Sequence, residues 1–141
     1  MKHSEDLGKL ILRVTVGSLM LFHGVAKLQS GIGGISGMLA AKGLPTALAY
    51  GVYVGEILAP LLLILGLFTR PAALVFVFNM IVAVALAHPG DLFKIGEHGG
   101  WALELQGFYI LTAIVVALIG PGAWSIDAKR QKKAWWQFGA K

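Results

Sequence analysis

The sequence predicts an all-α integral membrane protein, built as a bundle of four transmembrane helices. Of its 141 residues, 57% are hydrophobic and only 13% are charged. Segments 71–87 and 105–125 contain no charged residue, and segment 47–69 contains only Glu56. About 20 apolar residues suffice to cross a hydrocarbon core roughly 30 Å thick. Water-soluble helices of this length would show a polar face, which these segments lack.

The predicted bundle forms one domain over residues 1–128, followed by a tail at 129–141. We expect the helices at about 7–28, 46–67, 70–88 and 101–119. Pro45 and Pro71 suit the starts of the second and third helices. Pro89-Gly90 and Gly120-Pro121-Gly122 are typical helix stops and end the third and fourth helices.

The three connections differ in character. Segment 29–45 is rich in glycine and weakly polar, which predicts either a short interfacial helix or a loop folded back over the bundle. Phe68-Thr69 leaves room only for a tight hairpin, so the second and third helices must be antiparallel neighbours. Segment 89–100 is the one strongly polar loop, with charges at Asp91, Lys94 and Glu97.

The distribution of basic residues predicts that both termini are cytoplasmic. With that orientation only three of the twelve Lys and Arg residues, Lys27, Lys42 and Lys94, lie on the outer side. The other nine lie on the cytoplasmic side, as the positive-inside rule requires. We therefore expect a multi-pass protein of the bacterial inner (plasma) membrane.

The basic tail 129–141 accounts for much of the net charge of +5. Its Lys and Arg residues follow the last helix directly, and Trp135 and Trp136 stand beside them. This combination is typical of contact with anionic lipid headgroups, so the charge does not indicate nucleic-acid binding. A plain topology signal accounts for the same residues.

Five ionisable side chains interrupt the apolar segments: His23, Lys27, Glu56, His88 and Glu104. A charge at the bilayer centre costs roughly 3 kcal/mol on insertion scales, so such residues are expected to face one another inside the bundle. With Arg70 as the inner boundary and about 1.5 Å per residue, Glu56 lies roughly 21 Å up the bundle and His88 roughly 27 Å. The same arithmetic places all five in the outer half of the membrane, which predicts one polar pocket.

Two interpretations of this cluster stay open. His23 and Lys27 are four residues apart and share a helix face, so with the other three they can leave donors and acceptors free for a ligand. Alternatively, His88 and Lys27 reach interfacial water by snorkelling, and Glu56 forms only a structural pair with Lys27 or His23.

Other polar and small residues have structural explanations. Arg13, Arg70 and Asp127 belong to the inner end and are predicted to form an ion-pair knot between helices. Asn79 is expected to hydrogen-bond across to a neighbouring helix, and Gly17 and Gly24 to permit close helix approach.

The sequence gives little support for metal or thiol chemistry. His23, His88, His98, Glu56 and Glu104 are of metal-ligating types, and two histidines can hold haem, but no HExxH or similar motif accompanies them. We predict no metal site. The chain has no cysteine, which excludes disulfides and thiol redox chemistry by this chain alone.

An ordered set of motifs resembles the DoxX family over about residues 7–127. It comprises Leu12-Arg13 with Gly17, Phe22-His23-Gly24, Lys27-Leu28, Gly55-Glu56, Leu65-Gly66-Leu67-Phe68-Thr69-Arg70, Gly99-Gly100 with Glu104, and Gly120-Pro121-Gly122 with Ser125-Ile126-Asp127. The resemblance implies a four-helix inner-membrane protein. Some relatives are linked to membrane redox chemistry, as subunits resembling a thiosulfate–quinone oxidoreductase or as a partner of superoxide dismutase and a sulfurtransferase.

Three functions follow as hypotheses. In the first, the protein is a non-catalytic or accessory subunit of a membrane redox system, with a redox partner protein, and its outer pocket binds a quinone headgroup or a small anion. In the second it is a small transporter or proton-coupled carrier, for which four helices would require a homo-oligomer. In the third it is a membrane scaffold or assembly factor. The sequence does not select the ligand or the reaction.

Overall fold

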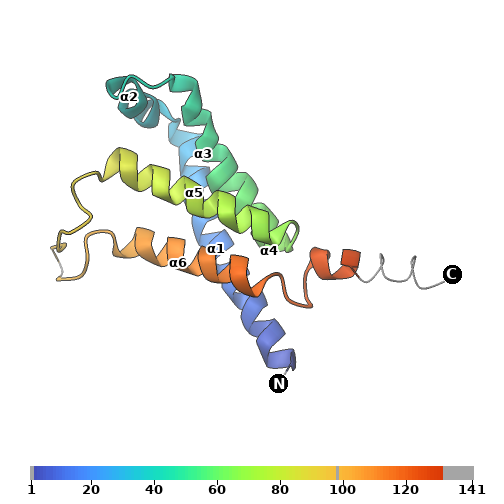
Figure 1. The fold of residues 1–141 in the computed structure, drawn as a ribbon. Coiled ribbons are helices and arrows are strands. Elements are labelled where there is room, and N and C mark those ends of the chain that lie inside the picture. Colours follow the sequence, from blue (N-terminus) through green and yellow to red (C-terminus); the bar gives the residue numbers. More distant parts are fainter. Residues whose placement is uncertain (1, 98, 132–141) are drawn as a thin grey trace.

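The computed structural model describes residues 2–97 and 99–131, and in these residues it is a bundle of helices without a sheet (Figure 1). The elements in chain order are α1 (Lys2–Ser30), α2 (Gly33–Ala41), the 3₁₀ turn η1 (Thr46–Tyr50), α3 (Gly51–Tyr53), the π-helical turn η2 (Val54–Leu58), α4 (Ala59–Leu65), α5 (Thr69–Ala87) and α6 (Glu104–Ile119). A last short helix starts at residue 126.

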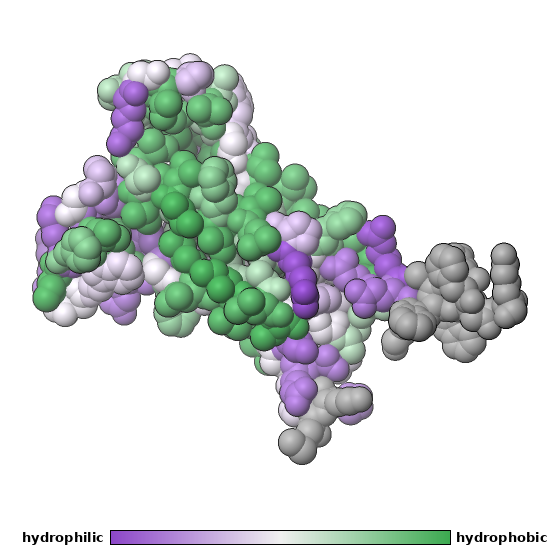
Figure 2. All heavy atoms as spheres, viewed as in Figure 1, coloured by the Kyte–Doolittle hydropathy of each residue, from purple (hydrophilic) through white to green (hydrophobic). Residues whose placement is uncertain are grey.

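The helices have the length and composition of membrane spans. Three described segments are long and apolar enough to cross a bilayer: His3–Ser30, Thr46–Leu65 and Thr69–Ala87. The fourth, α6, is apolar and shorter, with 16 residues. Figure 2 shows apolar side chains over the face formed by α5, with polar side chains gathered towards its edges. The predicted four-helix membrane bundle is confirmed.

The core is formed where all four spans meet. Val16 of α1, Leu63 of α4, Phe76 of α5 and Ala113 of α6 are 3% exposed or less and belong to one apolar cluster. The closest pairings are α5 with α6 and α1 with α4 (Figure 1). Most other large apolar side chains of the spans face outward, as they do when lipid surrounds a bundle.

The hairpin between α4 and α5 is where the sequence predicted it, but its helices end and begin slightly earlier. α4 ends at Leu65 because Gly66 adopts the left-handed conformation, with φ of 65°. The N–H of Leu67 then bonds to the carbonyl of Leu62, which closes the helix. Phe68 is also left-handed, with φ of 47°, and α5 begins directly after it.

Two helix starts and the regularity of the second span also differ from the sequence prediction. α1 begins at Lys2 and not near residue 7, because an acidic first turn, here with Glu5, favours a helix start. The second span is not one regular α-helix, since η1 and η2 interrupt it. α6 begins at Glu104 and not at residue 101, because Trp101 pairs with Ile95 in the preceding loop.

The glycine-rich segment after α1 contains a helix, α2, which was one of its two predicted forms. Left-handed glycines flank α2, Gly31 with φ of 81° and Gly43 with φ of 70°. The side chain of Lys42 donates to the carbonyl of Ala85 on α5 at 3.3 Å, which ties the end of α2 to the last turns of α5.

Two glycines of α1 let the second span approach closely, as the sequence predicted. A Cβ on Gly17 would lie 2.9 Å from the carbonyl oxygen of Pro60. A Cβ on Gly24 would overlap the carbonyl oxygen of Glu56 and the side chain of Ile57. Backbone therefore touches backbone at the level of Glu56.

Replacing Gly24 with alanine should destabilise the protein by about 1–3 kcal/mol, because the new Cβ must push η2 away from α1. Gly8→Ala in the same helix is the matched control, since nothing lies within 4 Å of a Cβ there. Thermal unfolding of both variants in one detergent measures the difference. Equal stability of the two variants would show that the contact at Gly24 is loose.

Candidate functional site

A cavity of about 250 Å³ lies among α1, η2, α5 and α6, near the end of the bundle where α5 stops. Its lining residues are Met20, His23, Lys27, Glu56, Met80, Ala83, Ala87, His88, Leu105, Gln106 and Tyr109. Four of the five ionisable residues singled out in the sequence are therefore brought to one cavity: His23, Lys27, Glu56 and His88.

The ion pair of Lys27 and Glu56 forms one wall of the cavity. Lys27 Nζ lies 2.5 Å from Glu56 Oε2, and the side chains are 29% and 6% exposed. Removing one partner from such a pair leaves an uncompensated charge in a low-dielectric setting, which is costly. Glu56 Oε2 therefore accepts a hydrogen bond from Lys27 Nζ inside the bundle, and both side chains line the cavity.

The π-helical turn η2 sets the position of Glu56. Val54–Leu58 inserts a wider turn into the second span, and such turns often occur at functional sites. Gly24 of α1 admits the backbone of this turn on one side, and Gly55 lies against the side chain of Asn79 of α5 on the other. The turn that carries Glu56 is thus clamped between two helices.

Two histidines add titratable groups to the cavity. His23 contacts the ring of Tyr109 edge-on, with centroids 6.1 Å apart, and Tyr109 in turn packs against Phe76. His88 Nδ1 lies 3.0 Å from Asp91 Oδ2. The arrangement supplies nitrogen and hydroxyl groups around an otherwise apolar space, which is the usual make-up of a small-molecule site.

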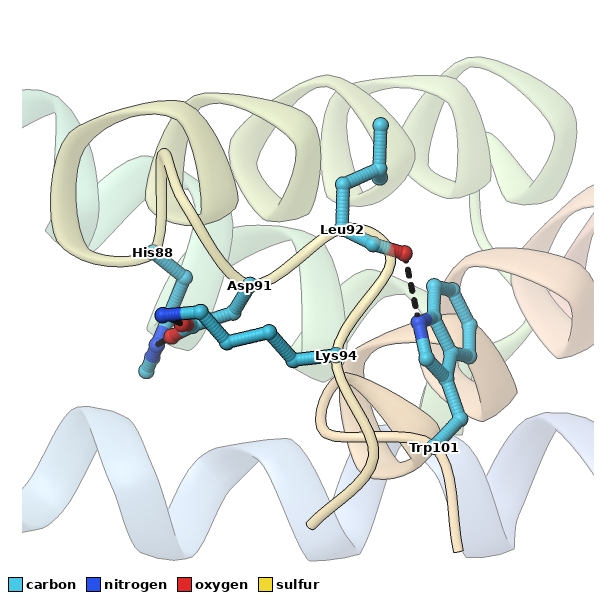
Figure 3. Close-up of polar contacts among 5 residues, drawn as sticks. All are labelled: His88, Asp91, Leu92, Lys94 and Trp101. Carbon is cyan, nitrogen blue, oxygen red and sulfur yellow. Dashed lines mark hydrogen bonds and ion pairs between the residues drawn. The ribbon is translucent and has the colours of Figure 1, made fainter.

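His88, Asp91 and Lys94 form a chain of polar contacts in the loop after α5 (Figure 3). Lys94 Nζ lies 2.9 Å from Asp91 Oδ1. Hydrogen bonds from Lys94 and then from His88 lower the pKa of the Asp91 carboxyl below its usual value. Trp101 Nε1 donates to the carbonyl of Leu92 at 2.8 Å and so fastens the same loop.

Glu104, the fifth residue of the sequence cluster, does not line the cavity. It occupies the first position of α6, is exposed, and packs back against Gly100. It therefore lies on a different side of α6 from the cavity. The inward face of α6 at this level carries Gln106 and Tyr109, three residues apart.

Gln106 and Tyr109 are the polar lining residues that sequence reasoning missed. Both are uncharged polar residues in an apolar helix. Their spacing on one helix face was the signal that would have found them, because a polar side chain in a span seeks the bundle interior.

The predicted knot of Arg13, Arg70 and Asp127 takes a different form. Arg13 is 1% exposed, and its guanidinium donates to the carbonyls of Leu63 at 2.9 Å and Ile64 at 2.5 Å, and also to those of Pro121 and Trp124. Within the described residues no Arg13–Asp127 pair comes within salt-bridge distance. Arg70 is exposed and lies beside Gly120.

Asp127 caps the start of α5 from a distant part of the chain. Its carboxylate accepts from the N–H groups of Phe68 and Thr69 and from the hydroxyl of Thr69, each at 2.9 Å. Burial alone would raise the pKa of Asp127, but the bonds from Thr69 and Phe68 outweigh it and lower this pKa. Phe68 occupies the N-cap position of α5 but has no side-chain oxygen to cap the helix, so the carboxylate of Asp127 takes that role.

Two predicted features concern residues that the structure does not describe. His98, named as a possible metal ligand, lies outside the described residues, as does the tail from residue 132 onward. In segments 2–97 and 99–131 no three His, Cys, Asp or Glu side chains gather closely enough to hold a metal ion.

The fold and the cavity define a small multi-pass membrane protein with a polar pocket among its helices. The chain belongs to the DoxX family, whose profile matches residues 8–89. A protein of Haemophilus influenzae named "Uncharacterized protein" is 37% identical over 125 residues, which cover 86% of this chain and 90% of that one.

Two other relatives have more informative names. "Inner membrane protein YphA" of Escherichia coli is 30% identical over 85% of this chain and 88% of its own length. "Putative oxidoreductase CatD" of Bacillus subtilis is 29% identical over 90% of each chain. No solved structure matches the chain at a significant level.

The lowered pKa of Asp127 predicts acid sensitivity. A carboxyl whose pKa is lower in the folded state contributes stability above its unfolded pKa, near 4, and this contribution fades as pH falls through the folded value. Asp127→Asn should therefore lower the melting temperature by several degrees at pH 7 and by less at pH 3. Melting curves of both proteins across this range test it, and a deficit independent of pH would contradict the charged cap.

Proposed function

We propose that the protein is a non-catalytic subunit of a membrane redox system, and that its polar cavity receives the headgroup of a quinone or a small anion. The observation that carries the proposal is the Lys27–Glu56 pair, with Glu56 buried and Lys27 partly buried, in the wall of a cavity that also has two histidines. An ionisable pair within a span is costly to keep, and such residues commonly mark ligand or proton pathways.

The chemistry of the lining suits a ligand that accepts hydrogen bonds. The ammonium of Lys27 and the imidazoles of His23 and His88 supply donors for a quinone carbonyl or for an anion. Gln106 and Tyr109 add an amide and a hydroxyl on the facing helix.

Proton movement is the second task that these residues suit. Reduction of a quinone to a quinol takes up two protons with two electrons. Glu56, His23 and His88 can exchange protons at the cavity, and His88 is linked through Asp91 to the polar loop. The chain has no cysteine for a thiol relay, so we assign the electrons to a partner protein.

The relatives agree with this assignment only in a general way. One is named "Putative oxidoreductase CatD" and another "Inner membrane protein YphA". By the distribution of Lys and Arg we place both termini in the cytoplasm, which puts the cavity towards the outer surface of the bacterial inner membrane.

A double variant tests the binding site without leaving a lone buried charge. Lys27→Met with Glu56→Gln should weaken binding of 2,3-dimethoxy-5-methyl-1,4-benzoquinone, or of sulfate, about tenfold or more, because a charged donor contributes roughly 1.5–3 kcal/mol. Calorimetric titration in phosphatidylethanolamine–phosphatidylglycerol nanodiscs measures it. Lys9→Met, near the opposite end of the bundle, is the control.

Two results would contradict the proposal. If neither probe binds the unmodified protein at millimolar concentration, the cavity is not the proposed ligand site. Unchanged oxidant sensitivity after deletion of the gene from its host would remove the redox role.

A further inference from the structure

A second cavity, of about 690 Å³, lies on the other side of the Lys27–Glu56 pair. It runs between α2, the first half of the second span and α5, and we call it the apolar groove. Its lining residues are Lys27, Ile35, Met38, Leu39, Leu44, Leu48, Ala49, Gly51, Val52, Val54, Gly55, Glu56, Val75, Phe78, Asn79, Val82, Ala83, Leu86 and Ala87. Its volume falls within the roughly 300–1,000 Å³ typical of small-molecule sites.

The apolar groove and the polar cavity are neighbours that share part of their walls. Lys27, Glu56, Ala83 and Ala87 line both. A ligand whose polar head lies at the ion pair therefore has an apolar channel beginning at the same place. Along α5 the groove extends from Val75 to Ala87, roughly 18 Å at the helical rise.

The groove opens towards the surface that faces lipid. Leu48 is 59% exposed and Phe78 is 68% exposed, and both line it. An apolar chain can enter sideways from the bilayer without crossing a polar barrier. An apolar channel that opens to lipid favours entry of a membrane-dissolved molecule and offers no favourable contacts to a water-soluble anion.

One polar group breaks the apolar wall. Among the described residues, Asn79 Nδ2 is buried without a hydrogen-bond partner. An unpaired amide donor in the interior costs free energy unless something accepts its hydrogen. Asn79 lies against Gly55, next to Glu56, and is one of the residues that line the groove. A rotation of its side chain would present this donor to an oxygen atom close to the head of a bound molecule.

We propose that the apolar groove holds the hydrocarbon tail of a membrane-dissolved amphiphile whose oxygen-bearing head occupies the polar cavity. The inference rests on the proposed function and narrows it, because it selects a tailed ligand over a small anion. α2 covers the groove from one side through Ile35, Met38 and Leu39, and Lys42 fastens it to α5.

Two probes distinguish the contribution of the head to binding from that of the hydrocarbon tail. 2,3-Dimethoxy-5-methyl-1,4-benzoquinone and its 6-decyl derivative carry the same head, and both are titrated into protein in nanodiscs of one lipid composition. The quantity compared is the ratio of their affinities in each variant, because partition of the decyl chain into bulk lipid is the same throughout.

Leu86→Trp should fill the groove from α5 and lower the affinity ratio about tenfold or more, since several methylene contacts are lost. Leu48→Trp should do the same from the opposite wall. Leu111→Trp is the matched control: Leu111 is 65% exposed and lines neither cavity, so the ratio should stay unchanged.

Asn79→Leu should weaken binding of both probes about fivefold, the value of one lost hydrogen bond.

The outcomes distinguish the two proposals. If both probes bind the unmodified protein equally well, or if the tryptophan variants keep the preference for the decyl probe, the groove is not the tail site and the proposed function stands. If neither probe binds, the proposed function fails and the tail site fails with it. Folding of each variant is checked beforehand by size-exclusion chromatography and melting temperature.

Discussion

The buried guanidinium of Arg13 is the interaction on which the rest of the bundle depends. It donates to the carbonyls of Leu63 and Ile64 at the end of α4 and to those of Pro121 and Trp124 in the segment after α6. A single side chain of α1 thereby joins the second span to the chain's last described segment. Asp127, in that last segment, then caps α5. One end of the bundle is closed by hydrogen bonds to backbone, which hold their geometry better than exposed ion pairs.

Closure at one end leaves the helices free to separate at the other. There the closest contact is between Gly24 and the π-helical turn that carries Glu56. About one turn further along α1, Lys27 pairs with Glu56, and the hydroxyl of Tyr53 donates to the carbonyl of Lys27 at 3.4 Å. The ion pair and the two cavities beside it therefore follow from where the helices are allowed to touch.

The sequence predicts the spans, the hairpin and most of the cavity because charge and hydropathy bear directly on them. A lone Glu56 in an apolar segment must face inward, and depth arithmetic correctly brings it to the level of Lys27. Depth alone cannot say which side of a helix a residue faces, so Glu104 was included while Gln106 and Tyr109 were missed. No local residue pattern marks the π-helical turn in the sequence, because the turn depends on close packing against Gly24 and Asn79. Likewise, Arg13 and Asp127 looked like partners, because a sequence shows charges but not free carbonyl or N–H groups.

The Lys27–Glu56 pair lies between a polar cavity and an apolar groove, and this position gives a functional reason for placing two ionisable side chains inside the bundle. A net-neutral pair disturbs the apolar groove less than either charge alone would, while each partner still offers hydrogen bonds on the polar side. Such a wall suits a molecule that belongs to both environments, with its head among titratable groups and its tail in lipid-like surroundings. Asn79, one of the residues that line the groove, adds one buried donor beside it. Because that donor is already buried and unpaired, a ligand oxygen that accepts its hydrogen gains a bond without displacing an existing partner, and this favours binding at the junction over dissolution in the bilayer.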